Sequence, residues 1–171
     1  SFTSGVGNTA GLAPFKFYRF RMMKEFPRQG ADFLWPPSGD NLAWLLRNNQ
    51  EMRRLANQPF SSMGLQLHIS LPEYRLEVRK PSEEYVSISY PYSLMSETLQ
   101  RLTFHLAAIL SNKESVLAFE EPESHAFPYY VRYLAELIAL DDGRNQYFIS
   151  THNPYFLLPI VEKTPKDELS V

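Results

Sequence analysis

Two short segments of the chain place polar side chains directly after apolar runs. Glu120 and Glu121 follow the apolar residues 116–119, and His152 follows a second apolar run over residues 147–149. Adjacent carboxylates repel one another, so a half-buried pair needs a cation, a hydrogen-bond donor or a shared proton. Mg²⁺ carrying phosphate oxygens meets that need, because one acid can hold its water shell while the next orients an attacking water. A histidine nearby can hold a terminal phosphate or that water, so the pattern indicates phosphate chemistry.

Each signal also has a simpler interpretation. Two acids after a strand are usually the start of a solvated loop, and a single histidine is more often a helix cap or a core residue. The order of the segments carries more information. An apolar run into Glu-Glu-Pro-Glu, then a helix, then an apolar run into Ser-Thr-His-Asn-Pro is hard to obtain by chance.

The first half of the chain predicts a mixture of strands and helices. Residues 15–26 alternate aromatic and cationic side chains, which favours a strand, with a stacking surface for single-stranded nucleic acid as the alternative. Apolar spacing predicts helices over residues 40–57 and 96–111, the second with Ser96 as its N-cap. Alternating runs between them predict an antiparallel meander with one wet face, over residues 65–71, 74–78 and 86–90.

The last third predicts a parallel unit. Residues 116–119 read as a strand covered on both faces, a helix follows from Pro128 to about residue 140, and residues 146–152 form another buried strand. A strand, helix and strand over this length form a right-handed crossover. Open α/β sheets bind ligands at the carboxyl ends of their strands, where the acids and the histidine would meet.

Composition limits the classes of function. The 171 residues, 44% of them hydrophobic, can bury one core, which we place at residues 14–164 between a loop (1–13) and a tail (165–171). A net charge of -2 and a pI near 6.1 give no overall attraction to nucleic acid or membrane. The absence of cysteine excludes disulfides and thiolate chemistry and fits a reducing compartment. With no apolar run of roughly 18 residues, we expect a cytoplasmic protein without a membrane partner.

Several stretches resemble one family of ATPases. "VLAFEEPES" resembles its Walker B strand, "THNP" its histidine switch, "SLMSETLQRLTFHLAAIL" its signature segment and "PPSGDNLAWLL" a segment before the second lobe. Residues 15–161 look like the carboxyl-terminal part of an ATP-binding-cassette-type ATPase of the RecF-like and chromosome-maintenance (SMC) group, among the stand-alone "AAA" ATPases of prokaryotes. The resemblance implies a P-loop NTPase-like α/β fold: a parallel sheet with helices on both faces, plus a small antiparallel portion.

The resemblance also assigns roles to four residues. Glu121 would be the catalytic carboxylate that polarises water, and His152 the switch histidine near the terminal phosphate. Glu120 would stand at the Mg²⁺ position. Ser96 would be the signature serine, aiming its hydroxyl and its helix at ATP bound by the other subunit of a homodimer or by a partner ATPase. Nucleic acid stays open as a further partner.

The chain departs from the family pattern at several positions. The family usually has aspartate at the position of Glu120, and a glycine soon after the signature serine, where this chain has Glu97. Ser93 is an alternative signature serine. The loop before Pro128 also lacks the usual Leu-His-Pro.

No segment matches the phosphate-binding pattern G-x-x-x-x-G-K-[ST]. Our first interpretation is therefore that the phosphate loop lies upstream of Ser1 and that the chain alone binds ATP poorly and is inactive. The alternative is a non-catalytic partner or regulatory module derived from such an ATPase. A metal-dependent nuclease built on Glu120, Glu121 and Glu123 is a third hypothesis.

Overall fold

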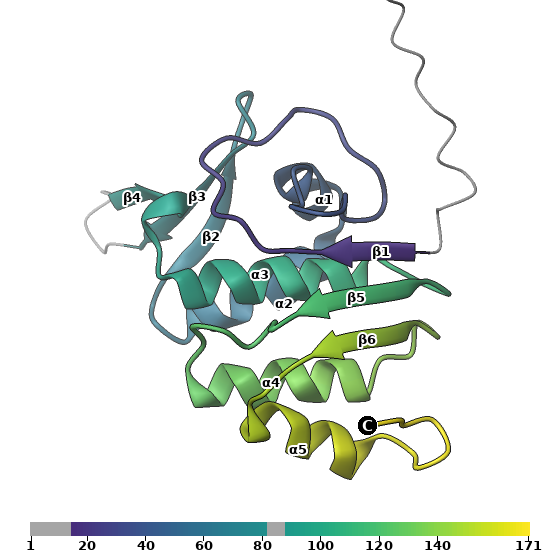
Figure 1. The fold of residues 1–171 in the computed structure, drawn as a ribbon. Helices are drawn as coiled ribbons and strands as arrows, with labels where there is room; N and C mark the ends of the chain where they lie inside the picture. Colours follow the sequence, from purple (N-terminus) through teal and green to yellow (C-terminus); the bar gives the residue numbers. More distant parts are fainter. Residues whose placement is uncertain (1–14, 82–87) are drawn as a thin grey trace, which may run out of the picture.

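Two three-stranded sheets and five α-helices make up the part of the chain that the structure, a computed structural model, describes: residues 15–81 and 88–171 (Figure 1). In chain order the elements are β1 (Phe15–Tyr18), α1 (Leu42–Asn48), α2 (Gln50–Ser61), β2 (Gln66–Ser70), β3 (Arg75–Lys80), β4 (Ile88–Pro91), the 3-10 helix η2 (Tyr92–Leu94), α3 (Glu97–Leu110), β5 (Val116–Glu120), α4 (Pro128–Ala139), β6 (Gln146–Ser150) and α5 (Pro154–Lys163).

The parallel sheet has β5 at its centre, between β1 and β6. Val116 pairs with Phe15 on one side and with Gln146 on the other, while Glu120 at the far end of β5 pairs with Ser150. The helix α4 connects β5 to β6, as a parallel pair requires. The predicted parallel α/β unit is therefore confirmed, and the carboxyl ends of its strands lie at one edge.

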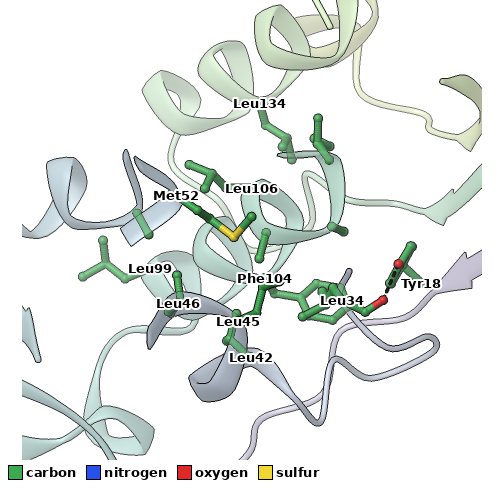
Figure 2. Packing of buried hydrophobic residues seen from close by; sticks show 14 of the residues in the cluster. Tyr18, Leu34, Leu42, Leu45, Leu46, Met52, Leu99, Phe104, Leu106 and Leu134 are labelled. Atoms are coloured by element: carbon green, nitrogen blue, oxygen red, sulfur yellow. Dashed lines mark hydrogen bonds between the residues drawn. The ribbon is translucent and has the colours of Figure 1, made fainter. Parts of the chain in front are cut away.

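One face of this sheet is buried against α3. Tyr18, Leu117 and Phe119 point to that side and are at most 3% exposed. The Tyr18 ring lies 6.0 Å from the ring of Phe104 on α3, and its hydroxyl donates a 2.6 Å hydrogen bond to the Leu34 carbonyl (Figure 2). The long apolar stripe of α3 is thereby removed from water, which is the main driving force for its helix.

The opposite face of the sheet is open among the described residues. Phe15, Phe17 and Phe148 are 63%, 48% and 58% exposed, and Val116 and Ala118 between them are half-buried. The prediction that 116–119 is covered on both faces, with helices on both sides of the sheet, is therefore not met here. A short apolar run does not reveal this, because the open face of β5 carries apolar side chains as well.

The antiparallel sheet β2-β3-β4 confirms the predicted meander, except for residues 86 and 87 of its third run, which lie outside the described residues. Leu76 and Val78 of β3 are buried, and β2 lies against α2. The alternate side chains face water, where the Ser89 hydroxyl donates a 2.6 Å hydrogen bond to the Glu77 carboxylate. One face of the sheet is therefore apolar and buried and the other is polar, as the alternation of side chains along a strand predicts.

The single helix predicted over residues 40–57 is two helices. Asn49 adopts an extended conformation between α1 and α2, and its side chain accepts a 2.9 Å hydrogen bond from the Met52 amide. Asparagine satisfies the free amides of a new helix better than it continues an old one. The apolar periodicity ran through the break because both helices face the same core.

The strand predicted over residues 15–26 ends at Tyr18. The Arg19 amide donates to the Pro37 carbonyl at 2.9 Å instead of continuing the sheet. Tyr18 and Phe26 are buried, so neither ring is available to stack on a base. The structure thus leaves the nucleic-acid alternative with fewer aromatic side chains than the sequence suggested.

Two predicted helices are confirmed as α3, which has Ser96 as its N-cap, and α4, which begins at Pro128. The predicted loop 1–13 lies outside the described residues, and the assignment of 165–171 as a tail stays a prediction. No helix in the described part of the chain combines the length and apolar character needed to cross a membrane.

Candidate functional site

The carboxyl ends of β5 and β6 bring the predicted acid and histidine together. The Nδ1 atom of His152 lies 3.1 Å from Oε1 of Glu121. The strand pairing continues one residue past β5, because the Glu121 amide donates a 2.9 Å hydrogen bond to the Ser150 carbonyl. These residues come from positions 31 apart in the sequence, and the parallel register places them side by side.

Glu121 is held in an unusual backbone conformation. Its φ angle is 42°, in the left-handed region that side-chain-bearing residues rarely adopt. The turn that follows is closed by the Ser124 amide, which donates to the Glu121 carbonyl at 3.0 Å, and by the Ser124 hydroxyl, which donates to Oε2 of Glu121 at 3.0 Å. The conformation turns the carboxylate out of the strand, where it is 46% exposed beside the 81% exposed His152.

Glu120 points to the open side of the sheet. It shares the β5 face of Ala118 and is exposed. None of the hydrogen bonds or ion pairs found among residues 15–81 and 88–171 involves its side chain, and no three acids, histidines or cysteines there gather into a metal-binding cluster. The carboxylate is therefore reachable, but the described residues form no complete cage around a cation.

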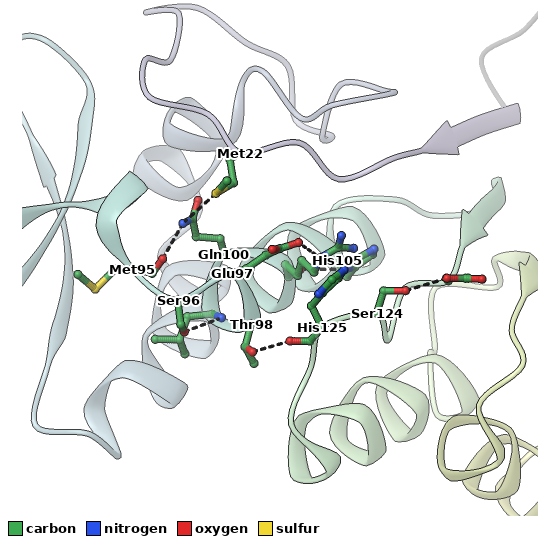
Figure 3. Close-up of polar contacts among 12 residues, drawn as sticks. Met22, Met95, Ser96, Glu97, Thr98, Gln100, His105, Ser124 and His125 are labelled. Carbon is green, nitrogen blue, oxygen red and sulfur yellow. Dashed lines mark hydrogen bonds and ion pairs between the residues drawn. The ribbon is translucent and has the colours of Figure 1, made fainter.

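Ser96 lies at the start of α3, on the same side as the loop that follows Glu121. The residue is exposed, and its hydroxyl accepts a hydrogen bond from the Leu99 amide at 3.4 Å. The Thr98 hydroxyl donates a 2.8 Å hydrogen bond to the His125 carbonyl, which ties the first turn of α3 to that loop (Figure 3). The alternative serine, Ser93, sits in η2 and does not cap α3.

The acid next to Ser96 is partly neutralised. Nε of Arg101, one turn further along α3, donates a 2.7 Å hydrogen bond to the Glu97 carboxylate. This ion pair directs the Glu97 carboxylate away from the start of the helix. Arg101 also lies over the Phe20 ring at 4.8 Å. An acid at this position would repel an incoming phosphate, and here its charge is paired within its own helix.

A buried contact that the sequence interpretation missed lies beneath the Glu121–His152 pair. Glu123 is only 4% exposed, and its Oε1 accepts a hydrogen bond from the Thr151 hydroxyl. Glu123 lies in the Walker B-like segment and Thr151 in the histidine-switch-like segment. From its place after Pro122 alone, Glu123 would be expected to face solvent. Nothing in the sequence showed that it turns inward.

Concave regions of the described surface lie away from these residues. An open depression on α2 is lined by Gln50, Arg53, Arg54 and Asn57 among others. A narrow one is lined by Phe20, Met23, Tyr92 and Phe104 among others. Neither includes Glu121, His152 or Ser96. The side chains of Glu121 and His152 themselves are 46% and 81% exposed, so this pair lies at an exposed edge of the sheet.

Comparison with protein families identifies one domain. Residues 75–158, from β3 to α5, match the family described as "AAA domain, putative AbiEii toxin, Type IV TA system". This range contains α3, β5 and β6, with Glu121 near its middle and His152 near its end. No curated protein matches the chain significantly.

Two solved structures are similar to the chain. One is an Smc head domain with an extended coiled coil, bound to the C-terminal domain of ScpA, from Pyrococcus furiosus: it is 18% identical with a TM-score of 0.46, over 70% of this chain and 32% of that one. The chain thus spans about a third of its length. The other comes from work on ATP-driven dimerization and DNA-stimulated activation of SMC ATPases, with 18% identity and a TM-score of 0.47, over 69% of this chain and 77% of that one.

Proposed function

Because residues 75–158 belong to the AAA-domain family of ATPases, we propose that the chain contributes the water-activating side of an ATP-hydrolysing centre. The observation that carries the proposal is the 3.1 Å contact between Glu121 and His152 at the carboxyl edge of the parallel sheet. An acid and a histidine at this edge are where phosphate chemistry is expected in an open α/β fold.

In this proposal Glu121 orients the attacking water. Its carboxylate is half exposed, so water reaches it, while Ser124 and His152 hold its two oxygens in place. A fixed carboxylate accepts a hydrogen bond from the water and polarises it toward phosphorus. His152, whose ring is more exposed than Glu121, then contacts an oxygen of the terminal phosphate and keeps water and phosphate in line.

Glu120 fits the role of a single Mg²⁺ ligand. Mg²⁺ is usually bound through one or two carboxylates together with substrate phosphates, so the lack of a complete protein cage suits it. When bound, the ion would neutralise charge on the phosphates. Glutamate in place of aspartate extends the carboxylate by one methylene, so we expect slow turnover.

We further propose that Ser96 acts on a nucleotide held by a second subunit. Ser96 is exposed and the amides of the first turn of α3 lie beside it, which is a favourable arrangement for phosphate. The pairing of Glu97 with Arg101 lowers the repulsion that this acid would exert. ATP would then be sandwiched between two subunits and its hydrolysis would separate them.

In this proposal the phosphate-binding loop is supplied from outside these 171 residues. The sequence has no G-x-x-x-x-G-K-[ST] segment, and the concave surfaces described above exclude Glu121 and His152. The open face of the parallel sheet is consistent with a further lobe, since exposed aromatic side chains on a sheet are normally covered. The same missing loop favours the alternative function, a non-catalytic module derived from such an ATPase.

The test is Glu121→Gln in the full-length protein, with ATP turnover and ATP-dependent dimerisation measured together. We expect turnover to be abolished while ATP binding and the dimer persist, because the amide keeps the shape but does not polarise water. Glu168→Gln, which removes an exposed charge outside the site, is the matched control and should turn over normally.

Normal turnover in Glu121→Gln would overturn the role of this carboxylate. Absence of turnover in the wild-type protein and every variant would favour the non-catalytic module. Metal-dependent strand cleavage without ATP would favour the nuclease hypothesis, for which the described residues offer no metal cluster.

A further inference from the structure

The carboxylate of Glu123 is buried without full hydrogen bonding. It is 4% exposed, its Oε1 is bound by the Thr151 hydroxyl, and its Oε2 has no hydrogen-bond partner among the described residues. A buried carboxylate with an unsatisfied oxygen is costly, and an apolar side chain of similar size would fill the space at lower cost. Stability alone is therefore a poor explanation for an acid at this position.

Glu123 reaches the second loop of the site through Thr151. The Thr151 hydroxyl donates to Glu123 and accepts a 3.1 Å hydrogen bond from the Asn153 amide. Asn153 in turn caps α5, its side chain accepting from the Tyr155 amide at 2.9 Å. One side chain of the β5 loop thus fixes the backbone on both sides of His152.

Two contacts therefore join the same pair of loops. The outer one, between Glu121 and His152, is exposed and at most weakly favourable by itself, since exposed ion pairs contribute little. The inner one, between Glu123 and Thr151, is shielded from water. Hydrogen bonds depend on direction as well as distance, so the inner contact sets the separation of the loops more tightly than apolar packing would.

We propose that Glu123 and Thr151 are positioning residues that hold His152 at the correct distance from Glu121. In this role they act only through Glu121 and His152, and neither of them touches substrate or the reacting atoms. The catalytic part of this inference rests on the proposed ATPase function. The claim that Thr151 fixes the position of His152 does not depend on that function, and it can be measured on the 171-residue chain.

The structural test is a nuclear magnetic resonance cycle on the His152 ring. Glu121→Gln should shift the His152 ring signals in the wild-type chain, because the two side chains are in contact. In a Thr151→Val background, which keeps the shape but removes the hydroxyl, that response should be lost. Thr151→Ser restores the hydroxyl and should restore the response. Thr103→Val removes a buried hydroxyl on α3, 2.8 Å from the Leu99 carbonyl, and should leave the response intact.

An unchanged His152 response in Thr151→Val would overturn the proposal. If Thr151→Val does not fold, as judged by thermal unfolding, Thr151→Ala takes its place and the same comparison decides.

The catalytic test uses the full-length protein. Thr151→Val should lower kcat by about 10- to 100-fold with KM for ATP unchanged, as expected for a misplaced catalytic group. Thr151→Ser should recover most of kcat, which a general loss of stability would not explain. An unchanged kcat in Thr151→Val, in a protein that Glu121→Gln inactivates, would overturn the positioning role alone. Full activity of Glu121→Gln would instead overturn the proposed function, and the resonance cycle would still report on the contact.

Discussion

Replacing His105 with asparagine should make the fold less sensitive to mild acid. His105 lies in the middle of α3 and is 2% exposed, with its ring 5.5 Å from that of Phe119 on β5. Its Nδ1 atom is 2.9 Å from the Arg101 carbonyl, an acceptor, so Nδ1 carries the proton of this hydrogen bond. Burial lowers the pKa of His105 from its ordinary value of 6.5 to about 3.

The direction of the effect follows from proton binding. Between pH 6.5 and about 3 the unfolded chain binds a proton at His105 that the folded chain does not, so the free energy of unfolding falls as the pH falls. At about pH 5 the unfolded histidine is almost fully protonated and the folded one is not. The wild-type protein should therefore lose about 2 kcal/mol between about pH 7.5 and pH 5 through this residue.

The assay is urea unfolding at both pH values, followed by the fluorescence of Trp35 and Trp44. Asparagine can keep the hydrogen bond to the Arg101 carbonyl and cannot become charged. His68, whose pKa is also lowered by burial, contributes with the same sign in both proteins and cancels in the comparison. Equal losses of unfolding free energy in wild type and His105→Asn would refute the reasoning.

Other predictions concern single contacts in the core and the turns. Tyr18→Phe removes a hydroxyl that donates to a carbonyl and accepts a 2.9 Å hydrogen bond from Asn112, and should cost about 1–3 kcal/mol in urea unfolding. No loss would mean that these groups find other partners. Gly64→Ala, at φ 69° with nothing within 4 Å of the added carbon, should cost roughly 1 kcal/mol. Gly39→Ala, at φ 72° with the added carbon 2.9 Å from an aromatic ring, should lower the free energy of unfolding, measured in the same way, by more than Gly64→Ala does. Equal shifts in the two glycine variants would contradict the steric argument.

Helices and strands could be predicted from the sequence where a capping residue, a proline or a clear alternation marked them. Pro128 and Ser96 marked the starts of two helices, and the alternating runs marked the meander. The break at Asn49 was missed because apolar periodicity reports which face is buried and is insensitive to a change of axis. The open sheet face was missed because local sequence carries no record of what packs on the far side of a strand.

The candidate site was predictable in part. The pairing of acid and histidine followed from two strand ends in a parallel sheet, and the structure brings Glu121 and His152 into contact. The inward turn of Glu123 was not predictable, because its burial depends on the left-handed backbone at Glu121 and on a hydroxyl that lies 28 residues away. Contacts of this kind depend on tertiary geometry, which residue spacing does not encode.

The open face of the parallel sheet has a consequence for how the protein is produced. Phe15, Phe17 and Phe148 form an apolar surface in the described chain, and two copies that met there would remove it from water. Self-association grows with concentration, whereas a tethered cover acts at a fixed and high local concentration. In the ATPase proposed above, a further lobe tethered to this chain would cover the surface. Expression together with that lobe should therefore give a higher soluble yield than expression of these 171 residues alone.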